Sequence, residues 1–421
     1  MRYIIIFSIV TLSPLFAHAA EDSRFAEMLQ DVLHNHPAVQ AEEAALEATR
    51  EGASEAASGF FPSVVAGYDK GRRKVRYNQL SPQYEDVNNK EIVVTQPIFN
   101  GGETIAQMGA ADARSQAGEA RLRLTKQQVL FNAIRAYVDV VEKQEVLQLV
   151  QENMDVLTLH LEGAKTQFSE GDLTITDIAQ SKARLARANA ELHDVSAALA
   201  SAYATYKREV GQDPAVVHLP PLPEGVPQSK EAVLALLDVH PAIIEAQQHE
   251  QAAEHTVDTR FAALLPDVTL QGLMRDQETS STPSINSADD RSLMLQVSVP
   301  LYQSGAEYAR LRQARHQRTQ AHSQVVDVSR SVRERMLRGW HDFQAAGDVI
   351  ESHQQAMAAA EEALRAVRIE QVEGTRTVQD VLNLQEEYYT NRINLTRAEA
   401  RHVAAAYRLL AVMGVLDRAM Q

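Results

Sequence analysis

The residue types that commonly carry out chemistry are not grouped into a catalytic, cofactor or metal site in this sequence. The fourteen histidines form no His-Glu-x-x-His cluster. His249 and His255 lie six residues apart, which places them on different faces of a helix and predicts a surface role instead of metal binding. No Gly-x-Gly-x-x-Gly, phosphate loop or Gly-x-Ser-x-Gly is present. We therefore expect no enzymatic activity, no cofactor and no metal.

Two polar motifs are notable for their spacing. Residues 171–177 read Gly-Asp-Leu-Thr-Ile-Thr-Asp, and residues 374–380 read Gly-Thr-Arg-Thr-Val-Gln-Asp. The two glycines are 203 residues apart, and so are the two aspartates. Glycine tolerates the positive φ of a sharp turn, and Thr375 or Thr377 could cap the helix that follows it. Each motif predicts a reversal between two long helices.

The same offset extends over most of the chain, which indicates a duplicated unit. Pro97-Ile98-Phe99 recurs as Pro300-Leu301-Tyr302 at 203 residues, and His36-Pro37 recurs as His240-Pro241 at 204. We expect repeat 1 at 21–211, a proline-rich linker at 212–230 and repeat 2 at 231–421. Each repeat holds helices, a β-hairpin and a long helical hairpin. The β-hairpins are expected at 63–99 and 267–302, and the long helical hairpins at 102–210 and 305–413.

Alternating polarity identifies the strands. Leu293, Leu295, Val297 and Val299 are apolar, whereas Ser292, Gln296 and Ser298 are polar, as in a half-buried strand. Residues 78–89 are rich in Asn, Pro, Ser and Asp, and residues 277–290 hold scarcely an apolar residue, so both are expected to be loops. Each strand is close to the ~9–11 residues with which a tilted strand crosses a bilayer. The alternative interpretation is that the four predicted strands belong to a soluble α+β domain.

The helical pattern is long and regular. Residues 102–168 contain no proline, and Leu130, Ile134, Tyr137 and Val141 follow heptad-like spacing, which predicts antiparallel coiled-coil packing. A helix of about 67 residues is roughly 100 Å long, enough to cross a periplasm.

The first twenty residues read as a secretory leader, with Arg2, an apolar run at 3–16 and the small-x-small site Ala17-His18-Ala19.

The chain has no cysteine, so it forms no disulfide, takes no lipid on a cysteine and is not a thiol enzyme. Its formal net charge of −15 argues against nucleic acid as a partner and would favour cations in a channel.

Membrane-spanning strands would need other copies of the chain. Four strands leave two open edges, and in lipid each unpaired backbone group costs several kcal/mol. Two copies would give eight strands, an interior filled by side chains, whereas three copies would give twelve strands and a lumen. We therefore expect a homotrimer.

This order of elements resembles the TolC family of outer-membrane channel proteins. The resemblance rests on Pro-Ile-Phe-Asn-Gly-Gly at 97–102, Pro-Leu-Tyr-Gln-Ser-Gly at 300–305, and Gly-Thr-Arg-Thr-Val-Gln-Asp-Val-Leu at 374–382. It implies a homotrimer with a twelve-stranded β-barrel in the outer membrane of a Gram-negative bacterium and an α-helical tunnel through the periplasm. It also implies a periplasmic adaptor and an inner-membrane transporter of the ABC or RND type as partners, and export of drugs or type I protein secretion.

The resemblance further implies roles at the tip. Arg376 is expected to pair with Thr176 and Asp177, and Asp380 to form an acidic ring at the entrance. The sequence departs from the family pattern at a second ring acid, replaced by Asn383, and at a tip tyrosine, replaced by Gln371. We expect a less firmly closed tip for this reason. The adaptor-contacting residues would be Gly171, Leu173, Gly374 and Thr375.

Two alternatives remain open from sequence alone. A periplasmic structural or adaptor-type coiled coil would share the long helices but not strands of membrane length. For the tip residues, a solvated and capped helix turn is the alternative to a gate. The missing lipidation cysteine and the Gly-Thr-Arg-Thr tip favour the TolC and type I secretion branch over lipoprotein efflux channels.

Overall fold

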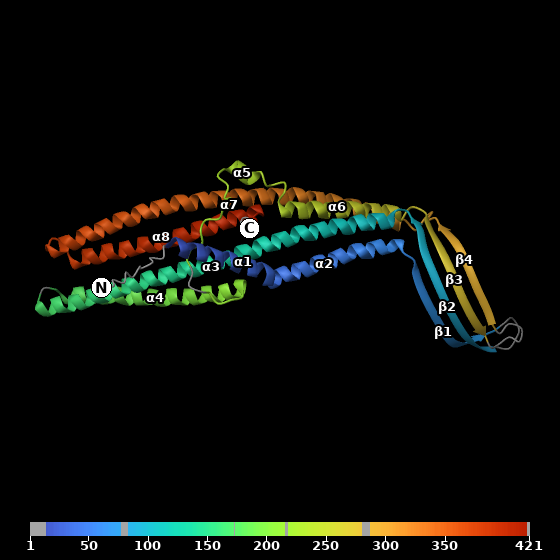
Figure 1. Ribbon diagram of the computed structural model, residues 1–421, viewed down its shortest axis with the longest axis horizontal. Helices are drawn as coiled ribbons and strands as arrows, with labels where there is room; N and C mark the ends of the chain where they lie inside the picture. Colours follow the sequence, from blue (N-terminus) through green and yellow to red (C-terminus); the bar gives the residue numbers. More distant parts are fainter. Residues whose placement is uncertain (1–13, 77–82, 172, 215–217, 280–286, 419–421) are drawn as a thin grey trace, which may run out of the picture. The chain divides into compact units, whose positions relative to one another are not determined.

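The computed structural model describes residues 14–76, 83–171, 173–214, 218–279 and 287–418 (Figure 1). Part of the expected leader, residues 1–13, lies outside the described residues. The described chain is mainly helical with a four-stranded sheet, which confirms the expected combination of long helices and β-hairpins, while the homotrimer stays a prediction. It divides into two compact units, of which unit 1 comprises Met1–Glu42, Leu122–Pro241 and Arg330–Gln421. Unit 2 comprises Glu43–Arg121 and Ala242–Ser329, so each unit takes segments from both repeats.

Unit 2 contains the sheet and the helical segments that lead into it. The strands are β1 (Ser63–Val75), β2 (Gln83–Asn100), β3 (Asp267–Thr279) and β4 (Ser287–Ser298). They are antiparallel in the order β1-β2-β3-β4, so the hairpins of the two repeats join through β2 and β3. Strands β1 and β4 are the edges of this sheet. The associated helices are α2 (Pro37–Ala57), α6 (Pro241–Ala262) and the first parts of α3 (Glu103–Glu170) and α7 (Ala306–Val372).

The strands differ from the expectation at their ends. Residues 83–89 belong to β2, residues 277–279 to β3 and residues 287–290 to β4, so the loop expectation was wrong for these residues. The rest of the two expected loops, 78–82 and 280–286, lies outside the described residues. Charged side chains on neighbouring strands pair there, as in the 2.6 Å contact from Arg72 Nε to Asp86 Oδ1, and polar composition therefore does not prevent pairing. The second hairpin ends at Ser298 instead of 302, shortly before Pro300, whose nitrogen has no hydrogen to donate.

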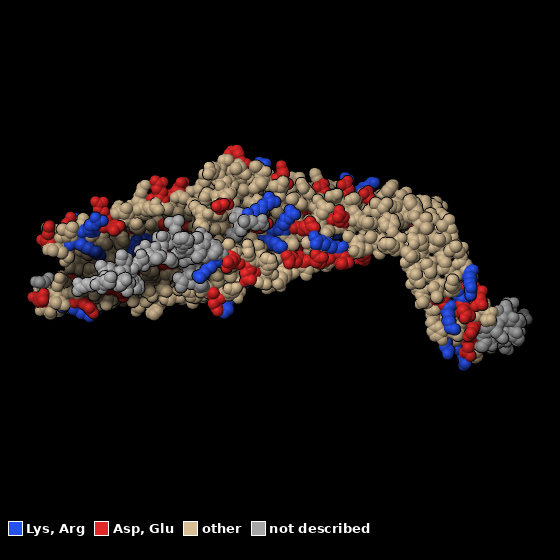
Figure 2. All heavy atoms as spheres, in the orientation of Figure 1, with Lys and Arg blue, Asp and Glu red and all other residues tan. Residues whose placement is uncertain are grey.

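The register of the sheet separates an apolar face from a more polar face. The residues of the apolar face are Val64, Ala66, Ile92, Val94, Leu270, Gly272, Met274, Leu293, Leu295 and Val297. Leu293 and Leu295 are 73% and 63% exposed, so nothing in the described chain covers this face. The opposite, more polar face carries Thr95, Gln271, Gln296 and the Glu91–Arg275 ion pair of 3.0 Å. Apolar residues lie between them on this face, namely Val65, Val93, Leu273 and Met294. Towards the loop ends of the strands, charged side chains replace the apolar ones (Figure 2).

Unit 1 is helical and is organised around aromatic packing. It contains α1 (Pro14–Asn35), α4 (Ile175–Val210), α5 (Lys230–Leu234), α8 (Val378–Met413) and the later parts of α3 and α7. The ring of Phe25 lies 4.9 Å from that of Tyr137 and 6.1 Å from that of Tyr407, in edge-to-face arrangements. These contacts join α1, α3 and α8 in a core that also buries Leu130 and Ile134 completely.

Matching glycines end the two return helices. Gly211 follows α4 with φ 85° and Gly414 follows α8 with φ 73°, the left-handed conformation that ends a helix at low cost for glycine. None of the described helices combines the length and hydropathy needed to cross a membrane.

Candidate functional site

The two tip turns are closely related in geometry. After α3 ends at Glu170, Gly171 adopts φ 93°, and after α7 ends at Val372, Gly374 adopts φ 78°. The second turn closes with a Schellman motif, because the Gly374 N–H donates to the Gln371 carbonyl and the Thr375 N–H to the Glu370 carbonyl. Both expected helix reversals are therefore present.

The repeated aspartates cap the helices that leave the turns. Thr174 N donates to Asp177 Oδ2 at 2.9 Å, and Asp177 N donates to Thr174 Oγ1 at 3.4 Å. Thr377 and Asp380 form the same reciprocal pair at 3.0 Å and 3.2 Å. This capping box satisfies backbone N–H groups that the helix itself leaves unpaired. The cap of α8 is thus Thr377, not Thr375, and capping accounts for the identical spacing of the two aspartates.

Capping also sets the charge state of both aspartates. Hydrogen bonds from the Thr174 side chain and backbone lower the pKa of Asp177. The backbone and side chain of Thr377 likewise lower the pKa of Asp380, with a smaller contribution from the charge of Arg376. Two carboxylates therefore stay ionised at the tips well into acid conditions.

Arg376 has an acidic partner within its own hairpin. Its Nε donates to Glu370 Oε2 at 2.9 Å, with both side chains about half exposed. Thr176 is exposed, and Asp177 is bound to Thr174. The pairing of Arg376 with Thr176 and Asp177 remains a prediction, and Glu370 is a competing partner that the sequence reasoning missed.

Asn383 is held by an arginine from the other repeat. Arg184, on α4, donates to Asn383 Oδ1 at 2.6 Å and to Glu386 Oε2 at 2.6 Å. It also donates to the Leu382 carbonyl at 3.3 Å, and its side chain is only 16% exposed. Arg184 thus joins the two helical hairpins just behind the tips. Sequence reasoning missed it because nothing in its local spacing distinguishes it from neighbouring basic residues.

The outermost surface of the tips is partly apolar. Gly171, Gly374 and Thr375 are exposed and Leu173 is half-buried, so the expected adaptor-contacting residues are at least partly accessible. Ile175 and Val372, which the sequence reasoning did not select, are 68% and 83% exposed. Two exposed apolar side chains therefore lie at the helix ends beside the tip turns.

A family model described as outer membrane efflux protein matches residues 28–212 and 234–415, one segment in each repeat. The chain belongs to the outer membrane efflux protein family. The resemblance read from the sequence is therefore confirmed, as is the location in the outer membrane. The family comprises channel proteins, and membership sets aside the periplasmic adaptor-type alternative.

Individual relatives cover nearly the whole of this outer membrane efflux protein. It is 28% identical to the outer membrane efflux protein BepC of Brucella suis over 95% of this chain and 87% of the relative. It is 25% identical to the alkaline protease secretion protein AprF of Pseudomonas aeruginosa, over 92% and 83%. Among solved structures, the outer-membrane channel OprN superposes with a TM-score of 0.82 at 19% identity, covering 97% of this chain and 94% of that one.

Removing the cap of α8 should loosen the second tip. Thr377→Ala deletes the hydroxyl acceptor for the Asp380 N–H, so we expect a loss of about 1 kcal/mol and roughly fivefold faster amide exchange in the first turn of α8. Hydrogen exchange with mass spectrometry on the full chain measures this. Thr390→Ala, on an exposed position within α8, is the matched control. Equal exchange in the two variants would contradict the capping role.

The same cap should depend on pH in a defined direction. Because the pKa of Asp380 is lowered from its ordinary 3.8, the cap contributes above the unfolded-state pKa and is lost as pH falls through the folded-state pKa. The ratio of exchange rates in the first turn of α8 between Asp380→Asn, which removes the charge, and the unaltered chain should therefore stay constant from pH 7 to about 5 and fall towards one below 3.8. A ratio that already changes near neutral pH would argue against ionised Asp380 as the capping group.

Proposed function

We propose that this protein is the outer-membrane exit channel of a tripartite export system, a passive conduit made of three copies and gated at its tips. The observation that carries the proposal is the four-stranded sheet with two open edges and an uncovered apolar face. Hydrocarbon is a suitable environment for that face but not for the edges, because unpaired backbone groups in lipid cost several kcal/mol each.

Closing the edges sets the number of copies. Edge strands β1 and β4 can pair between copies, and three copies give a twelve-stranded barrel wide enough for a lumen. The polar face would then line that lumen, with the Glu91–Arg275 pair among its charged groups. The apolar face would contact the outer-membrane lipid.

The helices support the periplasmic part of the proposal. Helices α3 and α7 contain 68 and 67 residues, and each returns through a capped turn. We propose that the tips meet a periplasmic adaptor and an inner-membrane transporter of the ABC or RND type. The proposed contact residues are Gly171, Leu173, Gly374 and Thr375, together with Ile175 and Val372. The names of BepC and AprF refer to efflux and to protease secretion, respectively. We propose that this chain exports small molecules, proteins or both.

At the tip, we propose that Arg376 exchanges between Glu370 of its own hairpin and Thr176 with Asp177 in the closed state. The bonds from Thr174 reach Oδ2 of Asp177, so Oδ1 can accept a guanidinium without loss of the cap. Asp380 and Asn383 would narrow the entrance beside this contact. An exposed pair contributes up to ~1 kcal/mol, and three copies give ~3 kcal/mol, about a hundredfold change in the open population.

The lipid-facing assignment predicts a face-specific effect of charge. Leu295→Arg places a cation in the middle of the apolar face and should destabilise the folded channel by about 2–4 kcal/mol in a bilayer. The control is Gln296→Arg, one residue along β4 on the polar face. Urea titration of protein folded in vesicles measures both. Similar stability losses for the two variants would contradict the assignment of faces.

The gate assignment predicts opposite effects of two tip substitutions. Arg376→Ala removes the closing cation and should raise the conductance of the purified protein in a planar bilayer. Glu370→Gln removes the competing carboxylate and should lower it, because Arg376 is then free for the closed-state contact. Arg365→Ala, an exposed arginine earlier on α7, is the control. Unchanged conductance of Arg376→Ala would overturn the gate while leaving the channel assignment intact.

A further inference from the structure

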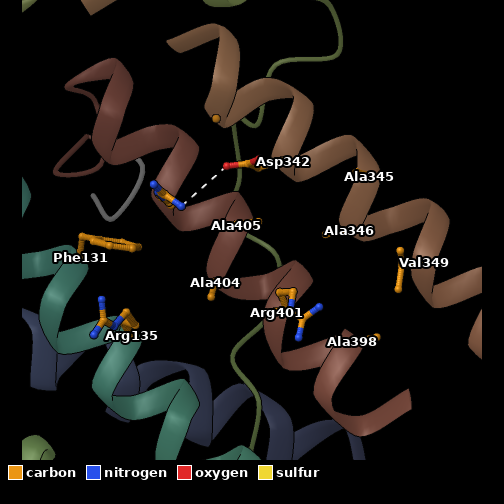
Figure 3. Close-up of a pocket in the computed structure, with 12 residues that line it drawn as sticks. Phe131, Arg135, Asp342, Ala345, Ala346, Val349, Ala398, Arg401, Ala404 and Ala405 are labelled. Atoms are coloured by element: carbon orange, nitrogen blue, oxygen red, sulfur yellow. Dashed lines mark ion pairs between the residues drawn. The ribbon is translucent and has the colours of Figure 1, made fainter. Parts of the chain in front are cut away.

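A groove of about 580 Å³ lies within unit 1, between α3, α7 and α8 (Figure 3). It is far from the tip turns in sequence, and neither the sheet nor the proposed gate uses it. Its hollow arises from small side chains on facing helices, since α7 contributes Ala345 and Ala346 and α8 contributes Ala398, Ala404 and Ala405. Volumes of about 300–1,000 Å³ are typical of small-molecule sites.

The charge of the groove is opposite to that of the chain. Three guanidinium groups line it, from Arg135, Arg401 and Arg408, whereas Asp342 is its sole acidic lining residue, in a chain whose formal net charge is −15. Arg408 Nη1 lies 3.7 Å from Asp342 Oδ2. Within the described part of the chain, Arg135 and Arg401 have neither an ion pair nor a hydrogen-bonded acidic partner. Two cations therefore face the groove without a counter-charge.

An apolar wall accompanies these cations. Phe131 and Arg135 are one helical turn apart on α3, and Val349 and the alanines of α7 and α8 line the remaining surface (Figure 3). A ligand that fits must therefore have both an anionic group and an apolar body. Guanidinium groups bind carboxylate, sulfonate and phosphate oxygens through paired N–H donors, and an aromatic ring provides a flat contact surface.

We propose that this groove is a binding site for small amphipathic anions, molecules with one acidic group and one ring or short alkyl body. Arg135 and Arg401 bind the anionic group, and Phe131 with the alanine wall contacts the apolar body. This site is distinct from the proposed tip gate. The channel could therefore bind an anion there without the adaptor or the inner-membrane transporter.

The test uses the purified full chain in lipid nanodiscs with 2-naphthalenesulfonate as the probe, followed by saturation-transfer NMR. We expect saturable binding that the uncharged analogue 2-naphthalenemethanol does not show. The double variant Arg135→Gln/Arg401→Gln should bind at least about tenfold more weakly, because both unpaired cations are gone. Arg333→Gln, an exposed arginine of α7 outside the groove, should bind as the unaltered protein does.

A second variant tests the cavity without altering its charge. Ala345→Phe fills the groove from its exposed α7 wall and should abolish binding while all three arginines remain. Absence of saturable binding by the unaltered protein would overturn the proposal. Equal binding by the double variant, or by the filled variant, would also overturn it, since the probe would then be bound elsewhere.

Discussion

The unpaired backbone of β1 and β4 is the constraint on which the rest of the molecule depends. A sheet that exposes an apolar face and two open edges is stable neither in water nor as a single copy in lipid. Exposed Leu293 and Leu295 favour hydrocarbon, whereas the edges favour pairing with further strands. Both demands are met when several copies close one sheet inside a membrane, and the outer-membrane location of the family agrees with that solution.

The helical tips combine a structural role and a proposed functional role in the same side chains. Asp177 and Asp380 hold the first turns of α4 and α8 through Oδ2, and that engagement keeps them ionised. A carboxylate fixed in this way is a rigid acceptor, because its position is set by the backbone it caps. In the proposed gate, Asp177 can therefore stay in place while Arg376 alone changes partner.

Local signals in the sequence were sufficient to predict most helices and strands. Contacts between residues far apart in the chain could not be predicted from such signals. Glycine and threonine at the turns were sufficient to predict the helix reversals at 171–177 and 374–380, because caps and positive φ values are local requirements. The polar ends of the strands were assigned to loops, because composition does not reveal that Arg72 lies opposite Asp86. Arg184 and the groove of Arg135 and Arg401 escaped notice for a related reason: their neighbours come from other helices.

The contact of Arg184 has a consequence for symmetry. Duplication of one unit in a threefold assembly would give a ring of six equivalent hairpins, but position 184 corresponds to Glu387 at the 203-residue offset, so the second repeat lacks this arginine. In the proposed trimer, the three seams within chains therefore carry this arginine contact, whereas the three seams between chains cannot carry its repeat-related equivalent. An assembly built in this way would have two kinds of seam, so opening of the ring need not be sixfold symmetric.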